Sequence, residues 1–184
     1  MTPFYFTLLA CALIGLAGRD AVRVSRLSAR LGHGPGLFAA IILAAIASSV
    51  LAAFLGAQLA SQLTVRAGSI FLAIALVLAA AETAFRRAPP APQEPTRSTG
   101  AIALVLTASL ATDGARFVIL GAAAISASPR LAGLGGIFGS GAVLCIAALA
   151  QGDWERLGRL APLRIAVAIL LLAAAGAMIV LSYE

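Results

Sequence analysis

Charged residues are scarce in this sequence, and lysine is missing altogether. Charged side chains make up 11% of the 184 residues and hydrophobic side chains 61%, whereas a soluble globular domain has about 25% charged residues. This fraction of charged residues is too small to cover the surface of a soluble domain. The composition therefore excludes a water-soluble enzyme or binding module. We expect an integral membrane protein with lipid around it and no separate aqueous domain.

Residues that build metal clusters and covalent catalysts are also rare. The chain has two cysteines and one histidine. Cys11 and Cys145 both fall inside apolar stretches, so they predict neither a disulfide framework nor a cysteine-ligated metal. No nucleotide-binding or hydrolase motif occurs in a fitting context. We therefore expect a protein that is not an enzyme and holds no resident cofactor.

Six apolar stretches are present, and most approach the roughly 20 residues that a helix needs to cross a bilayer. They lack the alternating polar pattern of barrel strands, so they predict an all-α membrane protein with six transmembrane helices. The first stretch has no positive residues before it and no Ala-x-Ala site after it, which favours a retained helix over a signal peptide. The stretches are residues 3–18, 37–59, 67–85, 101–125, 131–150 and 164–183.

The arginines are distributed unevenly between the connecting segments. The first, third and fifth connections contain ten arginines and the other side only two. Positive loops face the cytoplasm, so this bias predicts an inner-membrane protein with both termini outside, and it gives no reason to expect nucleic-acid binding. The ten are Arg19, Arg23, Arg26, Arg30, Arg86, Arg87, Arg97, Arg156, Arg159 and Arg164, and the two are Arg66 and Arg130.

A proline-rich segment divides the chain into two halves. Residues 86–100 contain four prolines among polar neighbours, which cannot continue a helix. This cytoplasmic linker separates three spans in residues 1–85 from three spans in residues 101–184, within a single membrane domain. Halves with an odd number of spans insert in opposite orientations, so we expect two inverted three-helix repeats, the layout of many secondary transporters.

The first span of each half is interrupted by glycine and charge. Gly18-Arg19-Asp20 closes the first apolar stretch, and residues 112–116 read Thr-Asp-Gly-Ala-Arg inside the fourth. An ionisable residue in hydrocarbon costs roughly 2.5 to 3.5 kcal/mol by insertion measurements, so it marks a place where something is paired, bound or moved. These two interruptions are the candidate functional sites.

With these features the chain resembles the GDT-one family of small six-span cation/proton exchangers, which includes manganese and calcium transporters of the Golgi type. The family has a Glu-x-Gly-Asp-Lys/Arg-Thr/Ser motif in the first helix of each half. In the second half Gly114 and Arg116 match the motif, whereas Thr112 and Ala115 replace its two acids. In the first half Gly18 matches, while Leu16, Arg19 and Asp20 occupy the Glu, Asp and basic positions.

This resemblance implies exchange of a divalent cation, Mn²⁺ or Ca²⁺, for protons. Hard cations take oxygen ligands, so Asp113 and Asp20 are the candidate metal-coordinating acids, and Asp113 is also the candidate proton carrier. Thr112 would add an oxygen, Gly18 and Gly114 would permit the helix breaks, and Arg116 would balance charge. The transported ion is then a substrate, and assembly into a homo- or hetero-oligomer stays open.

Other interpretations compete with exchange. Arg116 follows Asp113 by three residues, so the two can form an intrahelical ion pair with a structural role. Asp20 can be an interfacial residue paired with Arg19 or Arg23. The protein would then be a divergent scaffold, or the partner subunit of an exchanger, that does not transport.

Two further arginine patterns have simple explanations as well as functional ones. Arg19, Arg23, Arg26 and Arg30 form one stripe on a helix, which favours an amphipathic segment on anionic lipid over an anion pathway. Glu82 precedes Arg86 by four residues, which predicts an interfacial pair.

Overall fold

The computed structural model describes residues 2–32, 34–85, 98–154 and 160–182, which are largely helical and contain no strand. Four segments are long and apolar enough to cross a membrane, and six cross it if each of two bent helix pairs counts as one span. The chain therefore forms an all-helical protein with the character of a multi-pass membrane protein. Its elements are α1 (Thr2–Ala17), α2 (Arg19–Leu31), α3 (Pro35–Ala60), α4 (Val65–Phe85), α5 (Thr99–Ala111), α6 (Gly114–Ile125), α7 (Pro129–Ala150), η1 (Gln151–Asp153) and α9 (Leu160–Leu181).

The long helices lie close to the apolar stretches of the sequence. Pro35 and Pro129 stand in the first turns of α3 and α7, where the missing N–H of proline costs no hydrogen bond. The stretch at 101–125 is not one helix, because it is divided between α5 and α6. The 86–97 part of the proline-rich linker lies outside the described residues.

The first break separates α1 from α2, which meet at an angle of 60°. Gly18 lies between them with an extended backbone, φ −76° and ψ 155°. A Cβ atom at this position would lie 2.8 Å from the Ile14 carbonyl oxygen, which is too close for any side chain. Glycine is therefore required where the first helix ends and the second begins.

The second break separates α5 from α6, at an angle of 63°. The Thr112 hydroxyl donates to the carbonyl oxygens of Ser109 at 3.0 Å and Ala108 at 3.4 Å. Asp113 follows with an extended backbone, ψ 147°, and its backbone N–H donates to the Leu110 carbonyl. Short polar side chains compete with helical hydrogen bonding in this way, which explains why the helix stops inside an apolar stretch.

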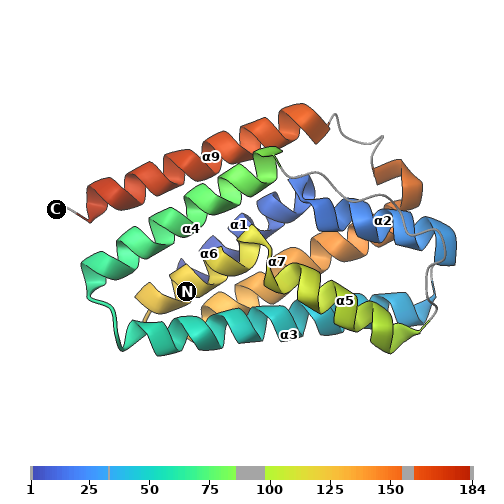
Figure 1. Ribbon diagram of the computed structural model, residues 1–184, viewed down its shortest axis with the longest axis horizontal. Coiled ribbons are helices and arrows are strands. Elements are labelled where there is room, and N and C mark those ends of the chain that lie inside the picture. The colour runs from blue at the N-terminus through green and yellow to red at the C-terminus, as the bar shows by residue number, and fades with distance from the viewer. Residues whose placement is uncertain (1, 33, 86–97, 155–159, 183–184) are drawn as a thin grey trace.

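Figure 1 shows how the two broken helices are arranged. Both breaks lie near the middle of the molecule, with α1 and α6 on one side of them and α2 and α5 on the other. The long helices α3 and α7 run past both breaks, while α4 and α9 pack side by side next to α1 and α6. The first turn of α1 and the last turn of α9 lie at the same end of the molecule.

Small residues allow the helices to pack closely around the breaks. Gly135 and Gly139 of α7 face the backbone of α1, and a Cβ atom at either one would overlap with atoms of Phe4 or Leu8. The two glycines are four residues apart, so they lie on the same face of α7. This contact places the middle of α7 directly against the helix that leads into the first break.

Candidate functional site

The two helix breaks enclose one small cavity between them. Its walls come from α1, α2, α5, α6 and α7, so both halves of the chain contribute to it. The space open to the centre of a water-sized sphere is about 10 Å³, which is room for roughly one water molecule. The lining residues are Cys11, Gly15, Gly18, Asp20, Ala21, Leu110, Asp113, Ala115, Arg116, Ser140 and Leu144.

Asp20 reaches the cavity from the first turn of α2. The residue is only 4% exposed, and it forms the ion pair with Arg23 that its place after an apolar stretch indicated. Its Oδ1 atom accepts a hydrogen bond of 2.7 Å from the Ser109 hydroxyl of α5, and Arg23 lies 3.4 Å away. Its Oδ2 atom is buried and has no hydrogen-bond partner. One carboxylate oxygen thus joins the two broken helices, while the other is left for an occupant.

Asp113 lines the same cavity from the second break. It stands at the N-cap position of α6, but its side chain caps no backbone N–H. Its carboxylate makes no hydrogen bond or ion pair with any described residue. The structure therefore brings together the two acids that the sequence singled out, each with carboxylate oxygen unpartnered.

Arg116 is the buried positive charge of the cavity, with 2% of its surface exposed. Its Nε and Nη2 atoms donate to the Ser48 hydroxyl at 3.0 and 2.9 Å, and Nη2 also donates to the Ser140 hydroxyl at 3.2 Å. The ion pair between Arg116 and Asp113 is not formed. The interpretation of residues 113–116 as a closed intrahelical pair is wrong, because serines of α3 and α7 hold the guanidinium instead. Its Nη1 atom is buried without a partner.

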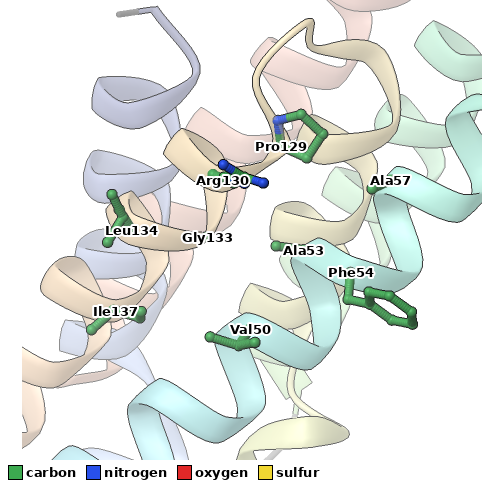
Figure 2. A pocket seen from close by; sticks show the side chains of 9 residues that line it. All are labelled: Val50, Ala53, Phe54, Ala57, Pro129, Arg130, Gly133, Leu134 and Ile137. Carbon is green, nitrogen blue, oxygen red and sulfur yellow. The ribbon is translucent and has the colours of Figure 1, made fainter.

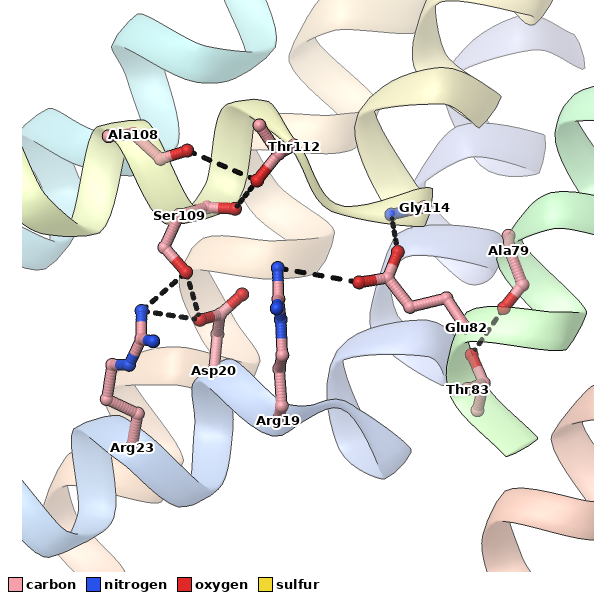
Figure 3. A network of polar contacts seen from close by, with 10 residues as sticks. All are labelled: Arg19, Asp20, Arg23, Ala79, Glu82, Thr83, Ala108, Ser109, Thr112 and Gly114. Carbon is pink, nitrogen blue, oxygen red and sulfur yellow. Dashed lines mark hydrogen bonds and ion pairs between the residues drawn. The ribbon is translucent and has the colours of Figure 1, made fainter. Parts of the chain in front are cut away.

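Glu82, near the end of α4, touches both breaks, as Figure 3 shows. Its Oε1 atom lies 3.5 Å from Nη2 of Arg19, and its Oε2 atom accepts a 2.6 Å hydrogen bond from the backbone N–H of Gly114. A carboxylate at the first turn of α6 is stabilised by the unpaired N–H groups and the helix dipole. Glu82 therefore ties the start of α2 to the start of α6. Arg86, its expected partner, lies outside the described residues.

Arg164 of α9 closes the other side of the first break. Its Nε atom donates at 3.1 Å to the Ala17 carbonyl oxygen, in the last turn of α1. Carbonyls in the last turn of a helix have no partner within the helix. Arg164 therefore satisfies one of the carbonyl oxygens at the end of α1 and links α9 to the first break.

The remaining predicted site residues are Thr112 and the two glycines, and the glycines do stand at the helix breaks as expected. Thr112 is exposed, does not line the cavity, and donates its hydroxyl to the backbone of α5. Gly18 lines the cavity, whereas Gly114 contacts α4, where a Cβ atom would lie 2.7 Å from the Cα atom of Ala79. Among the described residues no group of three His, Cys, Asp or Glu side chains could hold a metal ion. Among the side chains that line the cavity, oxygen atoms come from Asp20, Asp113 and Ser140.

Several functional contacts could not be recognised in the sequence. Ser48 and Ser140 are single hydroxyls within apolar helices, and Ser109 resembles any polar residue near a helix end. The Ser48 hydroxyl nevertheless links α3 to α6, because it accepts hydrogen bonds from Arg116. Glu82 was assigned to the interface because an arginine follows it at a helical spacing. The available signal was an acid within the last two turns of an apolar span.

The arginine stripe occupies a helix of its own. Because α1 ends at Ala17, the stripe lies on α2, a separate helix that meets α1 at an angle of 60°. Arg23 contacts Asp20, while the buried face of α2 packs through Val22 and Val24. The break at residue 18 therefore decides which arginines lie near the cavity. Arg19 and Arg23 do not line it, but each pairs with an acid beside it, Glu82 and Asp20 respectively.

Comparison of the chain with protein-family models, curated proteins and solved structures found no match.

Proposed function

We propose that this protein is a small secondary transporter that exchanges a cation for protons at the cavity between its two helix breaks. The observation that carries the proposal is the meeting of Asp20 and Asp113, from opposite halves of the chain, beside unwound backbone. Asp20 is buried and Asp113 half-buried, and acids with unpartnered oxygens are costly in an apolar protein. That cost is explained if a cation or a proton occupies them during part of a transport cycle.

The arrangement of the elements supports an inverted-repeat layout. Each half begins with a broken helix and continues with a long helix that runs past both breaks. In transporters of this design the site forms where corresponding broken helices meet, and alternating access follows from movement of one group of helices against another. The six spans then comprise α1–α2, α3, α4, α5–α6, α7 and α9, in a bacterial-type inner membrane with both termini outside.

The chemistry of exchange follows from the two acids. With both carboxylates ionised, Asp20 Oδ2 and the Asp113 carboxylate attract a cation, and water molecules complete its shell. Protonation of the carboxylates removes this attraction and releases the cation. Arg116 offsets part of the negative charge when the cavity is empty, so the two acids can face one cavity without an ion between them.

Divalent cations are the substrates that the family resemblance favours. Two carboxylates are fewer than the oxygen-rich sites that bind Mn²⁺ or Ca²⁺ tightly. A weak site suits a transporter, because the ion must leave as readily as it enters. Mn²⁺ and Ca²⁺ are therefore the first ions to test.

The second candidate function is a scaffold or partner subunit that does not transport. The ion pairs of Asp20 with Arg23 and of Glu82 with Arg19 favour it, because paired acids around the cavity stabilise a closed structure without any substrate. On this alternative the acids serve only to join the helix breaks.

Flux measurements separate the two functions. The purified protein is reconstituted into liposomes with a pH gradient, and Mn²⁺ and Ca²⁺ uptake is followed for the unsubstituted chain and for Asp113→Asn. We expect proton-driven uptake that Asp113→Asn abolishes. The matched control is Asp153→Asn, which changes an exposed acid in η1 away from the cavity and should transport normally.

Two other flux results would contradict cation exchange at this cavity. Flux that is absent from the unsubstituted protein, or that is unchanged by Asp113→Asn, contradicts exchange at this cavity and favours the scaffold. Anion uptake that is lost in Arg19→Ala and Arg23→Ala would identify the arginine-bearing helix as an anion pathway.

A further inference from the structure

A second and larger hollow lies on the outside of the helical bundle, between α3 and α7. Its volume is about 540 Å³, within the range of sites that bind small molecules. Figure 2 shows Pro129 and Arg130 at one end of this groove and Val50 and Ile137 at the other. Its walls are Val50, Ala53, Phe54, Ala57, Pro129, Arg130, Gly133, Leu134 and Ile137.

The walls of the groove are apolar apart from one end. Arg130 is its only charged lining residue and stands in the first turn of α7. A hydrated ion gains nothing from such walls, so the groove is not a path to the cavity between the helix breaks. An elongated apolar hollow on the outer surface of a membrane protein suits a hydrocarbon chain in both shape and chemistry.

Arg130 has no partner within the described part of the chain. It is exposed, and it makes no hydrogen bond or ion pair there. It is also one of two arginines in the connections that the charge bias places outside, where positive residues are disfavoured. An unpaired arginine in this position is best explained by an anion that it binds.

We propose that this groove is a phospholipid site, with one acyl chain along its apolar walls and the lipid phosphate on Arg130. Arginine binds phosphate through parallel hydrogen bonds. Because Arg130 stands at one end of the groove, the lipid headgroup would lie at the membrane surface while the acyl chain follows α3 and α7 inward. A second copy of the chain fits less well. It would have to supply an acid for Arg130 as well as an apolar ridge for the groove.

Lipid binding to the purified full-length protein tests the proposal. After delipidation in detergent, phosphatidylglycerol is added, and bound lipid is counted by native mass spectrometry while the unfolding temperature is recorded. Two further probes each supply one part of the lipid: diacylglycerol has the same acyl chains without the phosphate, and inorganic phosphate has no acyl chain. We expect phosphatidylglycerol to bind one per chain and to raise the unfolding temperature, and each partial probe to do so much less.

Two substitutions separate the headgroup from the chain. Arg130→Gln should weaken phosphatidylglycerol binding about tenfold while leaving the weak diacylglycerol effect unchanged. Ala57→Leu, which fills the groove from α3, should weaken both lipids. Arg66→Gln is the matched control, because it changes the other arginine of the same side and lies outside the groove.

The proposal is overturned if Arg130→Gln binds phosphatidylglycerol as well as the unsubstituted protein does, or if Ala57→Leu leaves lipid binding unchanged. It is also overturned if native mass spectra show delipidated chains pairing through this face, with no lipid in the dimer. Arg130 is exposed and Ala57 half-buried, and the mass spectra report binding independently of any change in folding stability.

Discussion

At the scale of single residues, the buried guanidinium of Arg116 depends on two hydroxyls from other helices. Ser48 accepts from two of its nitrogens and Ser140 from one. A buried charged donor without a partner costs more than a neutral one, because the guanidinium has lost its water. These serines are therefore structural requirements of the site, although they look unremarkable in the sequence.

Removing either hydroxyl should destabilise the protein. We expect Ser48→Ala to lower the free energy of unfolding by about 2 kcal/mol and Ser140→Ala by about 1 kcal/mol, in proportion to the hydrogen bonds lost. Denaturant unfolding in detergent measures both. Ser61→Ala, at an exposed position after α3, is the control. A smaller loss for Ser48→Ala than for Ser140→Ala would contradict this account of how Arg116 is held.

Gly114 provides a second test at this scale. A Cβ atom there would lie 2.7 Å from the Cα atom of Ala79, which belongs to the backbone of α4 and cannot turn aside. Gly114→Ala should therefore cost about 1 to 3 kcal/mol of stability through overpacking. Gly100→Ala, where nothing lies within 4 Å of the added atom, should be neutral or stabilising. Equal effects of the two substitutions would show that α4 and α6 are packed less closely than described.

At the scale of elements, the two broken helices are joined by polar contacts that keep the cavity small. Ser109 of α5 donates to Asp20 of α2, and Glu82 of α4 contacts the start of both α2 and α6. Each contact links a helix that begins at a break to a helix from elsewhere in the chain. We infer that access to the cavity requires at least one of these contacts to open.

Cys11 offers a native reporter of that opening, because it lines the cavity and is fully buried. Glu82→Gln keeps an oxygen for the Gly114 N–H but loses the charge that faces Arg19. The Glu82–Arg19 ion pair is partly exposed, so its loss should make opening of the cavity easier by about 1 kcal/mol. The open form is then roughly fivefold more populated, and Cys11 should react with a small thiol reagent roughly fivefold faster. The measurement uses Cys145→Ala chains, since Cys145 is also a free thiol. Unchanged reactivity would mean that Glu82 does not hold the breaks closed.

At the scale of the whole molecule, the sequence predicts the helices well and their contacts poorly. Apolar stretches of membrane length fix where α3, α4, α7 and α9 lie, because span length is a local property set by the bilayer. Gly18 and the Thr-Asp-Gly segment indicate both breaks for an equally local reason. Which acid meets which arginine depends on helix packing instead, so neither the contact of Glu82 with Arg19 nor the lack of an ion pair between Asp113 and Arg116 could be predicted from the sequence.

Topology is the remaining question at this scale, and it depends on the bent pairs. If α1 and α2 form one span, Thr2 and Gly34 lie on opposite sides of the membrane, whereas a re-entrant pair returns to the side from which it came. The same holds for Ser98 and Ala127, which flank α5 and α6. Six spans therefore place Thr2 and Ala127 on one side of the membrane and Gly34 and Ser98 on the other, whereas four spans place all four positions on the same side.

Single cysteines at these positions test this directly in chains that also carry Cys11→Ala and Cys145→Ala. With an impermeant thiol reagent added to intact cells, we expect Thr2→Cys and Ala127→Cys to be labelled from outside, and Gly34→Cys and Ser98→Cys only after the cells are opened. Labelling of Thr2→Cys and Gly34→Cys from the same side would make the first pair re-entrant. The first half would then cross the membrane twice, which contradicts an inverted repeat because halves with an even number of spans insert in the same orientation.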